Sequence, residues 1–377
     1  MIFSKPQRRH FVPFLESVIE LDGRRTITRI NGNEEKRTDV SNTIKFIRDT
    51  DWTKDELMAE NRRYFKITAP KSKTGFFIID DSVLEKAGKP KHMEGLGWHY
   101  SHSKGKTTCG HCLVSTHYRY GGVSFPYGFA MYRTEREAKG SGAEFKTKID
   151  IAREFIDTFE RFADEKVYVL MDSWYTSKEV LSSARARNFE VIGGLKSNRT
   201  FRLRENGPKH SLAAYARNLR NASYDEVIVN DTAYLVRRID CWISGAGNVA
   251  ILISKRKKDG SRCYILSTDT SLSNEGILRY YSYRWDIETG YLYCKDRLGL
   301  GHYQMRKMKA IEKYCALIFS AFCYLEALRH HNNQTSIGQS RRFFKLRRRR
   351  EFVDRIAHLV RRGMPLKKIY AELNIAA

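Results

Sequence analysis

The segment KVYVLMDSWY, residues 166–175, decides the fold. It holds an unbroken apolar run, residues 167–171, which ends at Asp172. A continuous apolar run of this length is typical of a strand buried on both faces, whereas a half-exposed strand alternates. The segment therefore predicts a central strand of a sheet that carries helices on its faces.

The neighbouring segments extend this strand into a mixed sheet. Short apolar or alternating runs predict strands, and a 3.6-residue apolar period predicts helices. In chain order we expect strands at 75–86, 107–118 and 123–132, a helix at 144–163, the strand at 166–175, a helix at 177–188 and a strand at 189–196. This β-β-β-α-β-α-β order predicts a mixed α+β protein.

The texture of the chain changes outside this block. Residues 1–70 carry apolar residues at helical spacing and predict a small helical N-terminal region. Residues 197–272 are mostly β-like, and Asp259-Gly260 within them predicts a hairpin turn. Helices return over 273–330, and a basic helical region follows at 331–377.

The charge of the chain points to an anionic partner. Among 377 residues, 68 are Lys or Arg and 43 are Asp or Glu, which gives a formal net charge of +25. Such an excess repels itself unless an anion is present, so nucleic acid is the expected partner rather than a membrane surface. The most apolar stretch, 314–328, is short for a bilayer span and contains Glu326. Without a signal-like N-terminal segment, a soluble, cytoplasmic protein is expected.

Acidic residues stand at the ends of two predicted strands. Asp80 and Asp81 end one apolar strand, and Asp172 ends another. A carboxylate at the end of a buried strand must be solvated, hydrogen-bonded or bound to a metal. Two such carboxylates joined by a third from a helix form an oxygen-rich cage that suits Mg²⁺ or Mn²⁺ and not zinc.

The third acid is expected in YSYRWDIETGYLYCK, residues 281–295. On one α-helix, Tyr281, Arg284, Glu288 and Lys295 fall within an arc of about 60°. A solvated face with an Arg284–Glu288 ion pair is one interpretation. The other is a site where Glu288 joins the strand carboxylates and the basic groups hold phosphates. A pair of metal ions about 3.5–4 Å apart activates a water or a 3′-hydroxyl for attack on a phosphodiester.

These motifs together resemble those of a DDE transposase of the broad IS4-like group, with IS701-type texture. IIDDSVLEK resembles the first-aspartate motif, VLMDSWYTS the second, and Tyr281, Arg284, Glu288 and Lys295 fill the helix signature Y-x2-R-x3-E-x6-K. The resemblance implies an RNase H-like core in two parts, 71–196 and 273–330. It also implies a β-rich insertion at 197–272. The basic residues of the helical region 1–70 and of the C-terminal region 331–377 predict DNA contact there as well.

The resemblance also implies roles for single residues. Asp81, Asp172 and Glu288 would bind two Mg²⁺ or Mn²⁺ ions. Asp81 is favoured because the residue before Ser or Thr is the usual ligand in this motif, but Asp80 stays open. The choice reverses if strand alternation turns Asp81 away from Asp172. Tyr281, Arg284 and Lys295 would contact transposon-end phosphates.

Relatives with this signature often excise DNA through a hairpin, in which a flipped base stacks on an aromatic ring. Trp242 is a candidate for that ring, and Tyr264 and Phe201 compete with it.

Further basic residues are expected to contact DNA. They are Lys196 after a sheet strand, the hairpin-tip residues Lys255, Arg256, Lys257 and Lys258, and Arg347 and Arg348 in the basic run 341–352. Clustered charges of this kind favour a phosphate backbone as partner.

The sequence thus predicts a metal-dependent DDE transposase that cleaves and joins double-stranded DNA at the ends of its own insertion sequence. A homodimer bridging two ends on target DNA is expected from the resemblance. Two alternatives remain: an RNase H-like nuclease without strand transfer, and a catalytically silent DNA-binding protein derived from a transposase.

Overall fold

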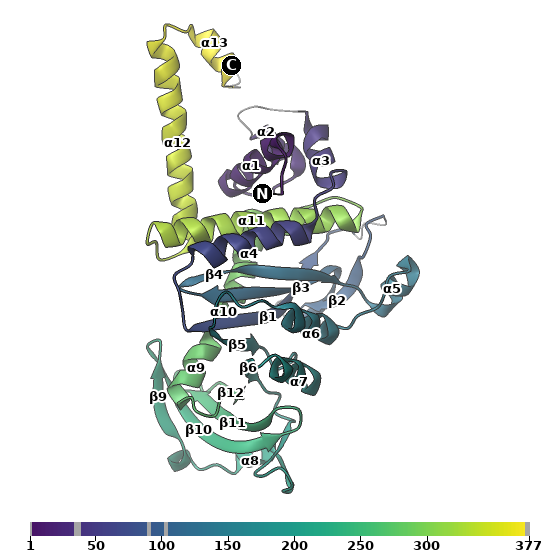
Figure 1. Cartoon of the computed structure of the whole chain (residues 1–377), viewed down its shortest axis with the longest axis vertical. Coiled ribbons are helices and arrows are strands. Elements are labelled where there is room, and N and C mark those ends of the chain that lie inside the picture. The colour runs from purple at the N-terminus through teal and green to yellow at the C-terminus, as the bar shows by residue number, and fades with distance from the viewer. Residues whose placement is uncertain (1, 34–38, 89–91, 102–104, 374–377) are drawn as a thin grey trace.

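The chain folds around one large mixed sheet, which confirms the predicted mixed α+β class. The structure is a computed structural model that describes residues 2–33, 39–88, 92–101 and 105–373. Its twelve strands follow the order β2-β3-β1-β5-β6-β12-β11-β10-β7-β8, with β4 beside β3 and β9 beside β10. Figure 1 shows the sheet running through the body of the molecule.

The central part of the sheet is formed by the predicted strands. β1 (Thr74–Glu85) pairs antiparallel with β3 (Lys106–Tyr120) and parallel with β5 (Lys166–Met171). β5 pairs parallel with β6 (Glu190–Gly194). Two further strands, β2 (Gly97–Ser101) and β4 (Val123–Tyr132), pair antiparallel with β3.

The two faces of this central part bury separate apolar cores. Phe76 and Ile78 of β1 belong to one cluster with Leu170 of β5, and Phe77 and Ile79 belong to the other cluster. The strand at 166–171 is therefore buried on both faces, as its unbroken apolar run predicts.

Different helices cover the two faces. On the face of Phe77 lie α6 (Lys148–Thr158) and α7 (Lys178–Ala186), which supply buried residues to that core. On the face of Phe76 lie α9 (Asn274–Ser282), α10 (Trp285–Tyr293) and the long α11 (Met308–His331). Glu288, the candidate site residue within α10, therefore lies on the Phe76 face of the sheet.

The β-like region at 197–272 extends the same sheet. It contains β7 (Thr200–Arg202), β8 (Lys209–Ser211), α8 (Leu212–Arg217), the 3-10 helix Asn221–Ser223, β9 (Asp225–Val229), β10 (Thr232–Ile243), β11 (Gly247–Arg256) and β12 (Arg262–Ser267). β12 pairs antiparallel with β6, so the strands of this region continue the central sheet rather than form a separate one.

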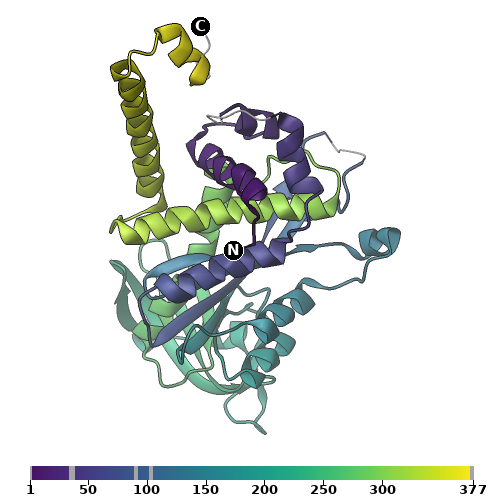
Figure 2. The same ribbon diagram turned by 45° about the horizontal axis from the view of Figure 1, so that its top comes forward.

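The remaining helices pack around α11 or project from the body. They are α1 (Lys5–Glu20), α2 (Ile27–Gly32), α3 (Val40–Arg48), α4 (Lys54–Thr68), α5 (Glu135–Ser141), α12 (Ile337–Arg361) and α13 (Leu366–Glu372). Figures 1 and 2 show α12 standing away from the body, with α13 at its far end. Across the described residues, every helix is too short or too polar to span a bilayer.

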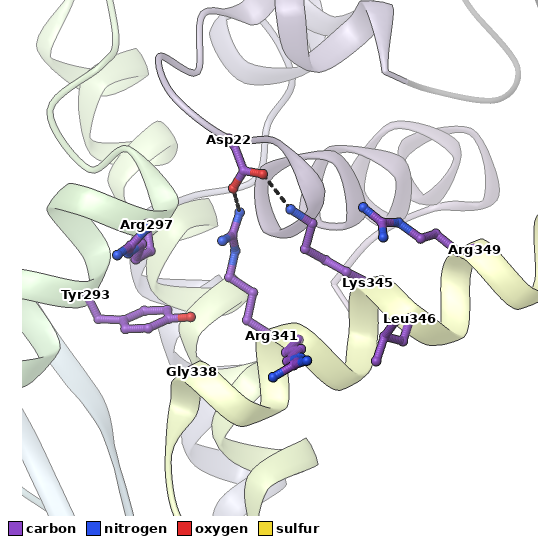
Figure 3. A pocket seen from close by; sticks show the side chains of 9 residues that line it. Asp22, Tyr293, Arg297, Gly338, Arg341, Lys345, Leu346 and Arg349 are labelled. Atoms are coloured by element: carbon purple, nitrogen blue, oxygen red, sulfur yellow. Dashed lines mark hydrogen bonds and ion pairs between the residues drawn. The ribbon is translucent and has the colours of Figure 1, made fainter.

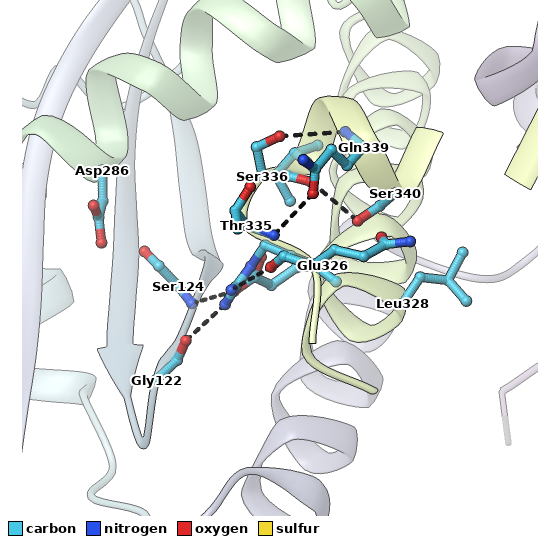
Figure 4. Close-up of polar contacts among 12 residues, drawn as sticks. Gly122, Ser124, Asp286, Glu326, Leu328, Thr335, Ser336, Gln339 and Ser340 are labelled. Carbon is cyan, nitrogen blue, oxygen red and sulfur yellow. Dashed lines mark hydrogen bonds and ion pairs between the residues drawn. The ribbon is translucent and has the colours of Figure 1, made fainter. Parts of the chain in front are cut away.

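A buried carboxylate fixes the point from which α12 departs (Figure 4). Glu326 of α11 accepts hydrogen bonds from the Ser124 backbone N–H at 2.8 Å and from Arg329 at 2.6 Å. Arg329 in turn donates to the Gly122 carbonyl at 2.6 Å. Ser336 then caps α12 by accepting from the N–H of Gln339. The end of α11 is thereby tied to the β3–β4 turn.

Candidate active site

Two acids come together where β1 and β5 lie side by side. The parallel register pairs Ile78 with Leu170 and Ile79 with Met171, so Asp80 is the next residue alongside Asp172. Side chains alternate along a strand, so Asp80 shares the face of Phe76 and Ile78. Asp172 follows β5 in the same alternation as Leu170.

Asp80 lies in a buried and negatively charged environment. Its Oδ1 accepts the backbone N–H of Asp81 at 2.8 Å, and its Oδ2 lies 3.8 Å from Nη1 of Arg284. Burial raises the pKa of Asp80 to about 7, and the negative charges of Asp172 and Asp81 add to that rise. Added positive charge beside Asp80 would favour its ionised form.

Asp172 is held by the turn that follows its strand. Its Oδ1 accepts backbone N–H groups from Trp174 at 2.8 Å and Tyr175 at 3.1 Å. Within the part of the chain that the structure describes, no hydrogen bond reaches Oδ2. One oxygen of the carboxylate thus orients the side chain, while the other stays available.

Glu288 is linked to Asp80 through Arg284. Oε1 of Glu288 lies 2.5 Å from Nη1 of Arg284, the same nitrogen that lies near Asp80. The Arg284 side chain is only 14% exposed, and among the described residues its buried Nε has no hydrogen-bond partner. A single guanidinium therefore sits between the carboxylates of β1 and α10.

Close packing places α10 against the sheet. A Cβ atom on Gly290 would lie 2.5 Å from Nε2 of His117 on β3, so only glycine permits this approach. Tyr291 adds polar contacts to the sheet. Its hydroxyl donates to the Asp80 carbonyl at 3.0 Å and lies 2.7 Å from the Ser115 hydroxyl. The position of Glu288 thus follows from contacts at the end of β1.

The signature residues 281–295 form three segments rather than the single helix expected. α9 ends at Ser282, α10 begins at Trp285, and a π-helix, Cys294–Leu298, follows. Lys295 in the π-helix donates to the Ser82 hydroxyl at 2.7 Å and the Val83 carbonyl at 2.9 Å. Its ammonium therefore contacts β1 just past Asp80.

Tyr281 meets the sheet at Gly194 of β6. A Cβ atom on Gly194 would lie 2.8 Å from the Tyr281 hydroxyl and 2.9 Å from the N–H nitrogen of Ser173. Burial raises the pKa of Tyr281, and the negative charge of Asp172 acts in the same direction. The phenol therefore keeps its proton at neutral pH and can donate a hydrogen bond, one strand away from β5.

Asp81 points to the opposite face of the sheet. Its Oδ2 pairs with Nζ of Lys148 at 2.7 Å and lies 3.5 Å from Sγ of Cys112, and its Oδ1 accepts the Tyr175 hydroxyl at 2.9 Å. Both oxygens are thus engaged by groups on the α6 side. The alternation places Asp81 away from Glu288, which corrects the expectation that Asp81, rather than Asp80, shares a face with that residue.

The chemistry of the donors fits a hard divalent cation, although the side chains are not gathered as a ligand cluster. Among the described residues, no group of three His, Cys, Asp or Glu side chains is arranged to hold a metal ion. The Arg284 guanidinium supplies the positive charge between Asp80 and Glu288. Mg²⁺ and Mn²⁺ prefer oxygen donors such as these carboxylates.

The other expected DNA-contacting residues lie on several separate elements. Lys196 is exposed directly after β6. At the β11–β12 tip, Lys257 pairs with Glu226 at 2.9 Å and Arg256 with Asp259 at 3.2 Å. Lys255 stacks on a tyrosine ring, and Lys258 is exposed. Part of the positive charge at this tip is therefore neutralised within the chain.

Arg347 and Arg348 of α12 are also engaged. Arg347 donates to the Tyr324 hydroxyl at 2.9 Å, and Arg348 lies 3.7 Å from Glu16 of α1. Glu351 lies 3.5 Å from Arg347 and 3.7 Å from Arg348. These contacts join α12 to the body, so neither guanidinium is as available as the sequence suggests.

The three aromatic candidates differ in access. Phe201 is 2% exposed and belongs to the core. Trp242 is half-buried, lies beneath Arg202, and lines a cavity of about 350 Å³ together with Arg199 and Lys209. Tyr264 packs against the core from β12. Of the three, Trp242 combines an accessible ring with basic neighbours.

Comparison with protein families gives one match. The family model described as "DDE superfamily endonuclease" matches residues 2–244, and the chain belongs to that family. The matched range includes Asp80, Asp81 and Asp172, while Glu288 and the rest of the signature lie beyond it. No curated protein matches the chain. The family supports an endonuclease-type enzyme with DNA as its substrate.

Two features of the site escaped sequence analysis. One is the position of Arg284 between Asp80 and Glu288, which the i, i+4 spacing signals only for Glu288. The other is the network of Lys148 and Tyr175 around Asp81. Nothing in the local sequence marks either residue as a partner of Asp81.

Proposed function

We propose that the protein is a DDE transposase, which cleaves DNA and joins the ends by transesterification at Asp80, Asp172 and Glu288. One observation carries the proposal: Asp80 and Asp172 stand beside each other at the ends of adjacent parallel strands, and α10 brings Glu288 to Asp80 through Arg284. Membership of the DDE endonuclease superfamily supports it. The order β4-β3-β1-β5-β6, with β1 parallel to β5, supports an RNase H-like core.

The first acid in this proposal is Asp80, in place of the Asp81 favoured by its sequence context. Asp80 has one oxygen directed at Arg284, and burial raises its pKa to about 7. Asp81, by contrast, has both oxygens occupied by Lys148, Tyr175 and Cys112. A carboxylate that lacks compensating charge is the better ligand for a cation.

Asp80, Asp172 and Glu288 would hold Mg²⁺ or Mn²⁺ ions, which supply an activated oxygen nucleophile and stabilise the leaving oxygen of the phosphodiester. Before DNA is bound, Arg284 pairs with Glu288 at 2.5 Å and compensates Asp80, 3.8 Å away, only in part. Once the acids are otherwise neutralised, its planar guanidinium is free to hold a phosphate oxygen pair. The protonated Tyr281 hydroxyl donates to phosphate from the β6 side.

The finer assignments belong to the same proposal. The Y-x2-R-x3-E-x6-K signature supports the IS4-like subtype, with Lys295 holding β1 in position through Ser82. The region 1–70 and the basic region 331–377 would bind DNA, and a homodimer would bridge two ends. Trp242 is the preferred partner for a flipped base, because Arg202 and the basic cavity beside it suit a nucleotide.

Plasmid cleavage tests the proposal. We expect purified protein to nick supercoiled DNA with Mg²⁺ or Mn²⁺, and Asp172→Asn and Glu288→Gln to abolish nicking. Asp286→Asn, on the same helix but paired with Arg119, is the matched control and keeps activity. Nicking that survives in Asp172→Asn and Glu288→Gln contradicts the proposal.

A second plasmid assay separates the alternatives. Supplied with pre-cleaved ends and a target plasmid, a transposase yields joined product, whereas a nuclease yields only cut DNA. DNA binding without any metal-dependent cleavage identifies a catalytically silent DNA-binding protein.

A further inference from the structure

A basic cavity of about 650 Å³ lies at the root of α12 (Figure 3). Its walls come from the loop after α1, from the end of α10 with the π-helix, and from the first turns of α12. The lining residues are Asp22, Tyr293, Arg297, Gly338, Arg341, Arg342, Lys345, Leu346 and Arg349. Five of these are basic and one is acidic, so the cavity carries an excess of four positive charges.

Two of the five basic residues build the wall. Arg341 is 9% exposed and donates to the Ile19 carbonyl at 2.7 Å, besides its pairing with Asp22 at 2.8 Å. Lys345 pairs with the other oxygen of Asp22 at 2.6 Å. Hydrogen bonds from Lys345 and Arg341 hold the pKa of Asp22 well below its usual range. This cluster ties α12 to the α1 loop and gives the cavity a defined shape.

The other three basic residues have no acidic partner. Arg297, Arg342 and Arg349 are exposed, and no ion pair involves them within the described residues. Arg342 and Arg349 are seven residues apart, so they stand about two turns apart on one side of α12. Burial raises the pKa of Tyr293 to about 12, so its hydroxyl keeps its proton. The cavity therefore offers more positively charged donors than Asp22 can balance, which suits a polyanion.

The cavity is separated from the acids by the signature helix itself. Tyr293 lies about 140° around α10 from Glu288, at about 100° per residue. Lys295 bonds to Ser82 on the sheet side, whereas Tyr293 and Arg297 line the cavity with α12. DNA cleaved at the acids and an anion in the cavity thus lie on different sides of one helical segment.

We propose that this cavity is a second DNA site, which binds the phosphodiester backbone of a duplex segment other than the one cleaved at Asp80, Asp172 and Glu288. The inference rests on the proposed function, because an enzyme that joins DNA must hold two segments at once. Arg297, Arg342 and Arg349 contact phosphate oxygens. Asp22 keeps Arg341 and Lys345 in the wall, which leaves the exposed arginines for the ligand.

Duplex binding in EDTA tests the site without requiring catalysis. The variant carries Arg297→Ala, Arg342→Ala and Arg349→Ala, and the control carries Lys71→Ala, Lys73→Ala and Lys106→Ala, three exposed lysines outside the cavity. Fluorescence anisotropy is measured with a labelled duplex at several salt concentrations. Loss of three phosphate contacts makes the slope of log K against log salt less negative by about 2–3. An affinity and slope equal to those of the control overturn the inference.

Two further readouts separate this inference from the proposed function. The arginine variant keeps wild-type nicking of a plasmid but loses joining of pre-cleaved ends to a second duplex at least tenfold. Equal losses of nicking and joining contradict a separate second site. Nicking that survives Asp172→Asn refutes the proposed function whatever the arginine variant does. Competition by excess inorganic phosphate as strong as that by unlabelled duplex shows a small-anion pocket and contradicts a DNA site.

Discussion

Asp80 and Asp81 are neighbours in the chain but lie in opposite environments. Asp80 faces α10, where the positive charge of Arg284 lies 3.8 Å away. Asp81 faces α6, where Lys148, Tyr175 and Cys112 engage both of its oxygens. Strand alternation alone produces this difference. A carboxylate already saturated with donors holds the fold together, whereas one left short of positive charge is the one that a cation can use.

Exchanging the two carboxyl groups separately gives the largest expected effect. Asp80→Asn lowers metal-dependent plasmid nicking about 10²–10³-fold, the usual loss when one charge-stabilising group leaves an active site. Asp81→Asn keeps nicking within a few-fold of wild type, provided that the assay runs below its lowered melting temperature. The reverse pattern would assign the site to Asp81 and undo the comparison.

The Lys148–Asp81 pair sharpens the structural side of the comparison. Lys148→Met leaves a largely buried carboxylate unpaired and lowers the free energy of unfolding by about 1–3 kcal/mol. Lys146→Met, a control two residues before Lys148, breaks an exposed ion pair with Glu154 and lowers the free energy of unfolding by less than Lys148→Met does. Denaturant unfolding measures both. A double-mutant cycle of Lys148→Met with Asp81→Asn that shows no coupling energy contradicts this account.

The packing of α10 against the sheet can be tested at Gly290, where the helix approaches β3. Gly290→Ala places a methyl group 2.5 Å from the His117 ring and costs about 1–3 kcal/mol through overpacking. Because α10 must move away from the sheet, nicking also falls as Glu288 leaves Asp80. Gly301→Ala, where no heavy atom lies within 4 Å, is the control and changes neither melting temperature nor nicking. A Gly290→Ala protein with wild-type activity would separate the helix position from catalysis.

The smallest expected effect concerns Arg284. Arg284→Gln frees Glu288 from its ion pair, so Mn²⁺ binding to the DNA-free protein tightens by about fivefold, or roughly 1 kcal/mol. Nicking falls in the same variant, because a phosphate contact is lost. Arg279→Gln breaks a comparable i, i+4 pair with Glu275 on α9 and leaves Mn²⁺ affinity unchanged. Weaker Mn²⁺ binding by Arg284→Gln excludes a competition between guanidinium and cation.

The central strands could be predicted from the sequence, but the choice between the two acids could not. In β1 the residues before Asp80 are apolar on both faces, so no alternation shows which face Asp80 takes. That information comes from the parallel pairing with β5, which is a tertiary contact. Likewise, the spacing of Tyr281, Arg284, Glu288 and Lys295 predicts one helical arc. That spacing carries no sign of the breaks at Tyr283 and Cys294.

The basic residues show the same limit. Charge clustering predicts a polyanion site on α12, but not which arginines remain available. Arg341 and Arg348 are used by the loop after α1 and by Glu16, contacts more than 300 residues away in sequence. Arg297 joins the α12 cavity only because the π-helix lies beside α12 in the fold. Long-range packing therefore decides the role of each basic residue.

The most direct measurement is Mn²⁺ binding to the DNA-free protein, followed by electron paramagnetic resonance in the wild type, Asp80→Asn and Asp81→Asn. We predict that Asp80→Asn loses the bound signal, while Asp81→Asn titrates like the wild type. A bound signal that persists in Asp80→Asn and disappears in Asp81→Asn would contradict the assignment of the cation to the α10 face of the sheet.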